Sequence, residues 1–368
     1  MHEMKMHETK RNKYRQIKLP AAGPSWYPAV MGIAILSTLI HLNRGLFPGL
    51  QILALLPFSI AWILLVTITG IFIIRIIRNR NAFIETISNQ NLIPMWGTVA
   101  MGILSVGSAT LTILPYWFPN ALSAAFWIDT VLWIIATFIG LITAFGFGVV
   151  LSGRIISSPI AVWGLAVVGP MVSATVGAGI AGNIDDIAIR GLILFLSTAC
   201  FFVAFVLGTV IFSRVYHYHW RISKIPTNAS LSAWIPLGMV GQSTAAVQVI
   251  AKNTEPIAHP EYAQMLHLLA DIYGCFMLGL SIPLIAWAIK MTVHGFKNQM
   301  AFTTGWWALT FPIGTLSLGA YYLSESTKIG LFHIYGVISL IALCFTVSFC
   351  LCTSARAVIE QQLAAKSQ

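Results

Sequence analysis

Charged residues are scarce in this chain, and their scarcity excludes a soluble domain. Of the 368 residues, 9% are charged and 57% are hydrophobic, and the mean hydropathy is +0.82. A soluble domain of this length needs a far more polar surface. Apolar runs of about 18 residues or more with few charges are typical of transmembrane helices. The sequence therefore predicts an all-α integral membrane protein.

Ten apolar runs are long enough to cross a bilayer. Lipid offers no hydrogen bonds to the backbone, so spanning segments of this kind must be helical. The predicted spans lie at about 26–42, 49–74, 93–114, 121–151, 158–182, 188–213, 229–251, 264–290, 300–323 and 329–353.

Positive charge is uneven between alternate loops. With the N-terminus inside, 17 of the 21 Lys and Arg residues fall on the inner side, and the outer loops hold only Arg44, Arg190, Lys252 and Lys328. The positive-inside rule predicts this distribution for ten spans with both ends in the cytosol. The net charge of +10 is thus a topology signal, and no clustered basic domain indicates nucleic-acid binding. We expect a multi-pass plasma-membrane protein, with a basic cytosolic tail at 1–25, a transmembrane domain at 26–353 and a second cytosolic tail at 354–368.

Phenylalanine is missing from most of the alternate runs. Five runs are rich in Gly, Ser, Thr and Ala, while the runs between them are packed with Ile, Leu, Val and Phe. A fixed period with one supersecondary unit per repeat indicates a repeated architecture. We therefore expect five quasi-repeated helical hairpins around a central pore, which is lined by the odd-numbered, small-residue helices. These helices begin, at intervals of 67 to 72 residues, near Trp26, Trp96, Trp163, Trp234 and Trp306.

Each small-residue run carries a proline. Pro28 and Pro94 suit a first helical turn, whereas Pro170, Pro236 and Pro312 are expected inside helices, where each frees a carbonyl four residues back. A freed carbonyl is tolerated where it faces a water-filled path. Small residues also allow close helix packing, which is the alternative for any single glycine. For the set as a whole we favour a pore, and its predicted lining is Gly32, Gly102, Ser105, Gly169, Pro170, Ser173, Pro236, Gly238, Gln242, Ser243, Thr310, Pro312 and Thr315.

Ionisable side chains are absent from the middles of these five runs. Cation pathways use acidic rings, and proton-coupled pumps use internal Asp, Glu or His relays. Hydroxyls and glutamines favour a weakly hydrated anion, although a neutral lining also suits other small solutes. Five cysteines and nine histidines show no metal-ligand or catalytic spacing, so no cofactor, metal or enzymatic activity is expected. An intramembrane enzyme and a receptor are the less favoured alternatives.

Phe311 is the exception among the small-residue runs. The first four contain no Phe, whereas the fifth contains Phe302 near its inner end and Phe311 directly before Pro312. A Phe at this depth could plug a narrow pore as a hydrophobic constriction. Ordinary packing against a bulky neighbouring helix is the alternative.

The segment from Gly305 to Pro312, GWWALTFP, resembles the ninth-helix motif of the tellurite-resistance/dicarboxylate transporter family. That family includes plant slow anion channels, malate permeases and sulfite efflux pumps. Further resemblance lies in Trp96-Gly97-Thr98, in the run from Gly169 to Ala174, and in Gly241-Gln242-Ser243. The long termini of plant members are absent. The resemblance implies ten helices in five hairpins, a homotrimer, and Phe311 as the residue that occludes the pore.

The same resemblance implies a substrate class. We expect transport of small anions, either C4-dicarboxylates such as malate or oxyanions such as tellurite, by a channel or facilitator, with sulfite efflux as the alternative. Four ionisable residues in the bulky runs, Asp129, His267, Asp271 and His333, are expected to have structural or subunit-contact roles. His267 and Asp271 are four residues apart and could pair on one helix face.

Overall fold

The computed structural model describes residues 19–153 and 158–366. The first 18 residues of the predicted N-terminal tail lie outside the described residues, as do Arg154 and the last two residues of the chain.

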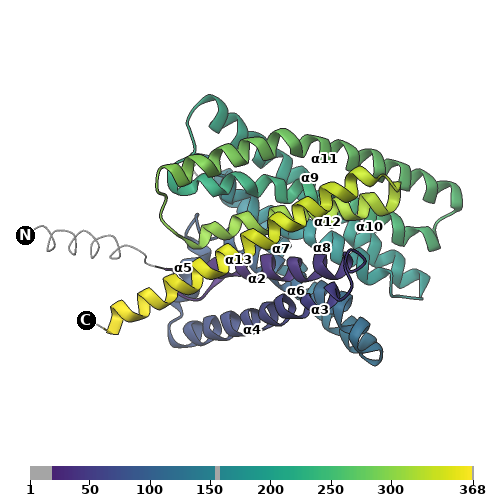
Figure 1. Ribbon diagram of the computed structural model, residues 1–368, viewed down its shortest axis with the longest axis horizontal. Coiled ribbons are helices and arrows are strands. Elements are labelled where there is room, and N and C mark those ends of the chain that lie inside the picture. The colour runs from purple at the N-terminus through teal and green to yellow at the C-terminus, as the bar shows by residue number, and fades with distance from the viewer. Residues whose placement is uncertain (1–18, 154–157, 367–368) are drawn as a thin grey trace, which may run out of the picture.

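Long α-helices make up most of the described chain (Figure 1). Their bounds are α2 (Tyr27–Leu42), α4 (Leu55–Arg78), α6 (Met95–Trp117), α7 (Leu122–Gly153), α8 (Leu165–Ala181), α9 (Ile187–Arg221), α10 (Ile235–Thr254), α11 (Pro260–Lys297), α12 (Thr310–Thr327) and α13 (Gly330–Lys366). The shorter elements are α3 (Leu50–Leu53), α5 (Asn81–Ser88) and the 3₁₀ segments η1 (Pro24–Trp26), η2 (Pro119–Ala121), η3 (Ala161–Gly164), η4 (Thr227–Trp234), η5 (Glu255–Ile257) and η6 (Thr304–Leu309).

Eight helical segments of the described chain are long and apolar enough to cross a membrane. They contain α2, α4, α6, α7, α8, α9, α11 and α13. The two long helices outside this set are α10 and α12, in which Gly, Ser, Thr and Gln replace large aliphatic residues. The prediction of an all-α membrane protein is therefore confirmed, while the assignment of α10 and α12 as membrane spans stays a prediction.

Five helices contact one another in an order that closes on itself. Helix α2 packs on α6, α6 on α8, α8 on α10, α10 on α12, and α12 again on α2. The remaining long helices cover them from outside: α4 on α2, α7 on α6 and α8, α9 on α8, α11 on α10, and α13 on α12. We call the first set the inner helices and the second set the outer helices.

Burial follows the same division. In an apolar 18-residue stretch of the segment that contains α8, 89% of the residues are buried within the protein. In the corresponding stretch of the segment that contains α4, only 22% are buried. Outer helices turn bulky side chains such as Phe138 and Phe276 away from the protein, and each of these is 67% exposed. Inner helices bring small residues into contact, as the close approach of α12 to Gly241 of α10 illustrates. The outer helices thus carry large apolar residues, because these face lipid, and the inner helices carry small residues, because these allow close helix packing.

The start of several inner helices differs from the prediction. Pro236 is the second residue of α10 and Pro312 the third residue of α12, so the prediction that both lie inside helices is wrong. The 3₁₀ segments η4 and η6 occupy the preceding residues and end where each α-helix begins. A first-turn proline costs little, because its missing N–H would have no helical partner there. Pro170, by contrast, does lie inside α8.

Three outer helices extend beyond their predicted ends. Helices α9 and α11 continue to Arg221 and Lys297, and α13 continues to Lys366. The predicted C-terminal tail at 354–368 therefore begins inside α13. Its first residue is part of the packed structure, because Trp307 Nε1 donates a hydrogen bond of 3.0 Å to Ser354 Oγ. In Figure 1 the C-terminal turns of α13 extend from one end of the bundle. We call this the terminal end and the opposite one the distal end.

Candidate functional site

Phe311 lies between two contacts that fix its direction on α12. The preceding residue, Thr310, packs so closely on Gly32 of α2 that a β-carbon there would overlap its hydroxyl. The following residue, Pro312, faces α10, where its Cγ would lie 3.6 Å from a β-carbon at Gly238. Successive residues of an α-helix are rotated by about 100°. Phe311 therefore points between α2 and α10, either toward the centre of the inner helices or directly away from it.

The contacts of α12 with the outer helices decide between these two directions. Ser317 Oγ donates a hydrogen bond of 2.8 Å to the carbonyl of Gly336 on α13. Leu323 packs on Gly274 of α11, with its Cδ1 2.9 Å from the position of a β-carbon. Both residues are rotated from Phe311 by about 120°, in opposite senses. The outer helices thus lie behind α12, and Phe311, at 3% exposure, points into the centre of the inner helices.

A cavity of about 270 Å³ opens at the terminal end. Every inner helix or the segment just before it contributes to its wall. Its lining includes Met31, Met95, Leu165, Ile235 and Ala308. The 3₁₀ segments η4 and η6 form a large part of the wall, and their role was missed by the sequence analysis, which treated these residues as parts of membrane spans.

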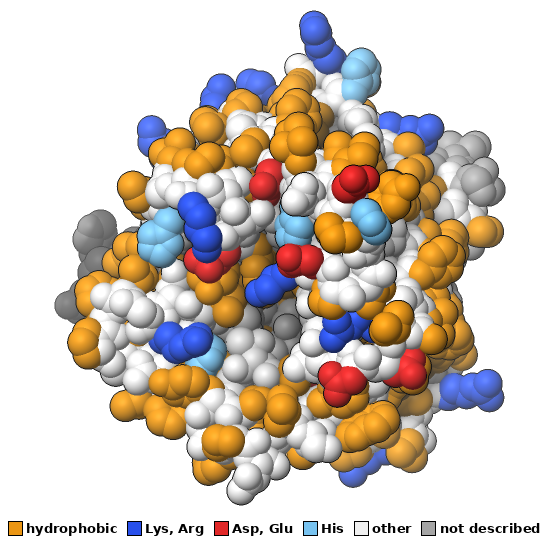
Figure 2. Space-filling view, turned by 90° about the vertical axis from the view of Figure 1, so that its right-hand side faces the viewer, with side chains coloured by type: hydrophobic (Ala, Val, Ile, Leu, Met, Phe, Trp, Pro, Cys, Tyr) orange, Lys and Arg blue, Asp and Glu red, His pale blue; other side chains and the backbone are white. Residues whose placement is uncertain are grey.

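A second cavity, of about 480 Å³, lies at the distal end, between the inner helices α2, α10 and α12 and the outer helix α11. It is lined by Leu42 of α2, Gln248 and Lys252 of α10, and Tyr321 and Lys328 at the end of α12, among others. Figure 2 looks onto this end and shows acidic, basic and histidine side chains around a hollow. Ala308 of η6 borders the first cavity and Tyr321 of α12 the second, a helical distance of about 20 Å along the chain. Phe311 lies between them.

Other residues share the inward face of α12. Leu318 and Tyr322 follow Phe311 by seven and eleven residues, so all three lie within about 20° of one direction. Tyr322 also borders the distal-end cavity. These two residues were missed by the sequence analysis, although their spacings of seven and eleven residues from Phe311 could have indicated them.

On α6, Ser105 takes a comparable position. Gly97 packs against the backbone of Leu165 on α8, and a β-carbon at Gly102 would lie 3.1 Å from the ring of Tyr27 on α2. Helical rotation places Ser105 between these two contacts, toward the centre. It is 7% exposed, compared with 2% for Gln242 and 0% for Thr315.

Helix α8 presents its predicted lining residues to a neighbouring helix. A β-carbon at Gly169 would lie 3.4 Å from Cα of Gly140 on α7, and the ring of Pro170 borders the same contact. Trp133 of α7 donates a hydrogen bond of 2.9 Å to the carbonyl of Ser173. The structure therefore places these three residues at the contact between α8 and α7.

On α10, Gln242 joins two inner helices. Its Nε2 donates a hydrogen bond of 2.8 Å to Thr175 Oγ1 on α8, and its Oε1 has no partner among the described residues. The next residue, Ser243, donates to the carbonyl of Val240 at 3.1 Å. Pro236, in the first turn, lies one residue after Ile235, which lines the terminal-end cavity.

The hydroxyls of the two predicted lining threonines of α12 also donate to backbone carbonyls nearby in the chain. Thr310 Oγ1 donates to the carbonyl of Trp307 and Thr315 Oγ1 to that of Pro312, each at 2.8 Å. Side chains engaged in this way offer few fixed donors to a ligand. No Lys, Arg, Asp or Glu occurs in α2, α6 or α8, and those of α10 and α12 lie near the distal end. Such surroundings can pass an anion without binding it tightly.

Asp129 is buried behind the inner helices. It is 1% exposed, and its Oδ1 would lie 2.5 Å from a β-carbon at Gly107 of α6. No hydrogen-bond partner of this oxygen occurs among the described residues. The carboxyl thus fills space that the glycine leaves open, on the side of α6 that faces α7.

The predicted pair of His267 and Asp271 does not form. Gln248 Nε2 donates to Asp271 Oδ1 at 2.9 Å, while His267 Nε2 lies 3.8 Å from Glu255 Oε2. Each side chain has a nearer partner on a neighbouring element than along its own helix. In the part of the chain that the structure describes, no three His, Cys, Asp or Glu side chains gather as a metal site.

Comparison with known sequences identifies the family. The SLAC1 family, described as voltage-dependent anion channel, matches residues 21–355. The chain belongs to this family. Its resemblance to the tellurite-resistance/dicarboxylate transporters is thereby confirmed, and anion transport across a membrane is the activity of the family.

Two named relatives are similar to this chain over most of its length. The sulfite efflux pump SSU1 of Trichophyton rubrum is 25% identical over 341 residues, which cover 88% of this chain and 88% of the relative. The sulfite efflux pump SSU1 of Arthroderma otae is 24% identical over 329 residues, which cover 85% and 84%.

Proposed function

We propose that this chain carries small inorganic oxyanions along the centre of its inner helices, from one cavity to the other, with Phe311 as the constriction. The observation that carries the proposal is the position of Phe311, which points inward between the two cavities. Supporting it are the closed contact order of the inner helices and their uncharged middles. Passage is channel-like or facilitated and requires no catalytic group, so we propose no enzymatic activity.

The proposed membrane arrangement has ten spans. Helices α10 and α12 join the eight apolar segments, because both are enclosed by outer helices that shield their polar residues from lipid. Consecutive inner and outer helices then form five hairpins, within a domain at 26–353. We propose that both tails face the cytosol and that the membrane is the plasma membrane, on the strength of the 17 basic residues assigned to the inner side.

Among the expected substrates, the relatives favour sulfite over malate or tellurite. An oxyanion of this size suits a path whose polar groups are single hydroxyls and one amide. Malate is the second candidate, because the family resemblance includes malate permeases. We also propose a homotrimer with one path per subunit, again by family resemblance, and mass photometry in nanodiscs measures that state directly.

A flux assay tests the proposed function. Purified protein in liposomes is given sulfite, tellurite or malate on one side, and uptake of each anion is followed with time. We expect uptake of sulfite above that of protein-free liposomes and above that of malate. Equal uptake rates for malate and sulfite would contradict the proposed preference for inorganic oxyanions. No uptake of any anion by folded protein would contradict the proposal that the chain transports anions.

A further inference from the structure

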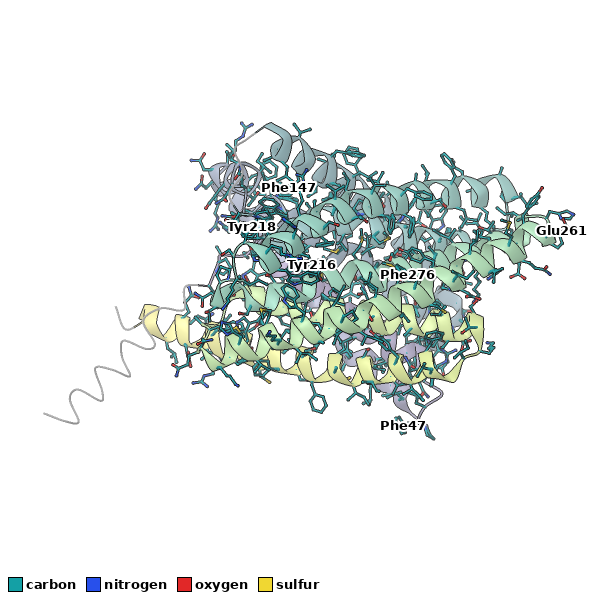
Figure 3. All side chains as sticks on the ribbon, turned by 90° about the horizontal axis from the view of Figure 1, so that it is seen from above. Phe47, Phe147, Tyr216, Tyr218, Glu261 and Phe276 are labelled. Atoms are coloured by element: carbon teal, nitrogen blue, oxygen red, sulfur yellow. The ribbon has the colours of Figure 1, made fainter. Side chains whose placement is uncertain are left out.

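A third cavity, separate from the path past Phe311, lies at the terminal end between α9 and α11. Its volume is about 410 Å³, and it has no lining residue in common with the terminal-end cavity of the path. Figure 3 shows Tyr216 and Tyr218, on the last turns of α9, at the end of the molecule opposite to Glu261. We call this cavity the α9–α11 pocket.

Four basic or titratable side chains converge on the α9–α11 pocket: Lys224, Lys290, His219 and His294. None of its lining residues is acidic. The parts of the chain next to the pocket are equally free of acid, because residues 187–234 and 272–297 contain no Asp or Glu, and the two acids of α11, Glu261 and Asp271, lie toward its other end. Among the described residues, no carboxylate lies within 4 Å of either lysine nitrogen.

His219 is oriented by a backbone group. Its Nδ1 lies 3.0 Å from the carbonyl of Ser223, so this nitrogen carries the hydrogen and Nε2 remains available. Basic residues near helix C-termini also complement the helix dipole. That effect explains single charges, whereas a cavity bordered by two lysines and two histidines without a counter-charge is suited to bind an anion.

Aromatic residues form the other wall. Trp220 and Trp287 meet edge to face, with ring centroids 6.1 Å apart, and Tyr216 packs on Trp287 at 5.2 Å. Trp220 is 56% exposed on the outside of the bundle. Trp is enriched where the bilayer meets water, at the depth of the lipid headgroups. The α9–α11 pocket thus combines headgroup depth with positive charge.

We propose that the α9–α11 pocket binds a phosphate monoester, presented as the headgroup of an anionic lipid of the phosphatidic acid type. A monoester carries up to two negative charges and three acceptor oxygens, which match the ammonium groups of Lys224 and Lys290. The free Nε2 of His219 can accept the hydrogen of a singly protonated phosphate. The apolar wall of tryptophans and Met291 accommodates the glycerol and the first methylenes of the acyl chains.

An occupant of the α9–α11 pocket would contact the segment that leads into the wall of the transport path. Ile225 lines the pocket, and Asn228, three residues later, lines the terminal-end cavity. The intervening segment leads into η4, which is fixed to α11 by a hydrogen bond of 2.9 Å from Trp234 Nε1 to Thr292 Oγ1. Lipid binding would therefore bias the conformation of η4, and this regulatory consequence rests on the proposed function.

Binding is tested independently of transport. The thermal unfolding midpoint of the purified full chain is measured with dioctanoyl phosphatidic acid, dioctanoyl phosphatidylcholine or inorganic phosphate. We expect a dose-dependent rise with phosphatidic acid and none with phosphatidylcholine. A rise with inorganic phosphate as well assigns the site to phosphate from either source, and its absence assigns it to the lipid. Equal rises with both lipids would overturn the proposal.

Charge-matched variants locate the site. Lys224→Ala with Lys290→Ala should abolish the rise, whereas Lys252→Ala with Lys328→Ala, which removes two charges at the distal end, should keep it. If the first double variant does not fold, Lys290→Gln alone should raise the apparent Kd for phosphatidic acid about tenfold. An unchanged response in folded Lys224 and Lys290 variants would overturn the proposal, whether or not the protein transports anions.

Discussion

Gly32 of α2 and Thr310 of α12 are in direct contact, immediately before Phe311. A β-carbon at Gly32 would overlap the hydroxyl of Thr310, so only glycine permits this approach of the two helices. The contact fixes the rotation of α12 and thereby the direction of Phe311. The packing of α2 on α12 and the direction of Phe311 therefore depend on the same contact.

Gly32→Ala should separate α2 from α12 at this point. We expect a loss of about 1–3 kcal/mol in the free energy of unfolding, as for other overpacked cores, measured as a lower thermal midpoint. The matched control is Gly279→Ala in α11, where no atom lies within 4 Å of the added carbon. A midpoint for Gly32→Ala equal to that of the control would show that the helices are not held this closely.

Gln242→Glu should reduce anion flux about tenfold or more. A carboxylate at this position, which is 2% exposed, repels an anion passing within a few ångström. Gln242→Met is the control, because it also loses the hydrogen bond to Thr175 but adds no charge. Initial rates of sulfite uptake compare the two. If both variants transport equally well, Gln242 does not face the path.

The Trp307–Ser354 hydrogen bond should hold the end of α13 against η6. Trp307→Phe and Ser354→Ala should each lower the unfolding free energy by about 1 kcal/mol. Since each single variant removes the same hydrogen bond, the double variant should lose less unfolding free energy than the sum of the two single losses. Chemical unfolding curves give the three values. Strict additivity would mean that the residues do not interact.

Asp129→Asn should leave anion flux within about twofold of the native rate, because the carboxyl faces Gly107 at the contact of α6 with α7 and does not border either cavity of the path. Gly107→Ala should lower the thermal midpoint, and adding Asp129→Ala should restore part of it by making room. A large loss of flux in Asp129→Asn would indicate proton coupling and contradict a purely structural role.

Sequence patterns predicted the helices and their inner or outer position, because lipid-facing and helix-facing residues differ in size. They missed the starts of α10 and α12, since a proline in a first turn and one inside a helix look alike in sequence. Phe311 was singled out because the first four small-residue runs contain no Phe and the other Phe of the fifth, Phe302, lies near the inner end of that run. The position of Ser173 could not be predicted, because a residue whose backbone carbonyl accepts a hydrogen bond from Trp133 of α7 is indistinguishable in sequence from one that faces a pore.

The central proposal is that the ring of Phe311 closes the path. Current through purified protein in planar bilayers should be compared for the native chain, Phe311→Ala, and Phe276→Ala, which removes a Phe that is 67% exposed on α11 (Figure 3). We expect Phe311→Ala to raise the anion current at least about tenfold, by opening a dewetted constriction, while Phe276→Ala matches the native chain. Equal currents for all three folded proteins would contradict the proposal that Phe311 is the gate.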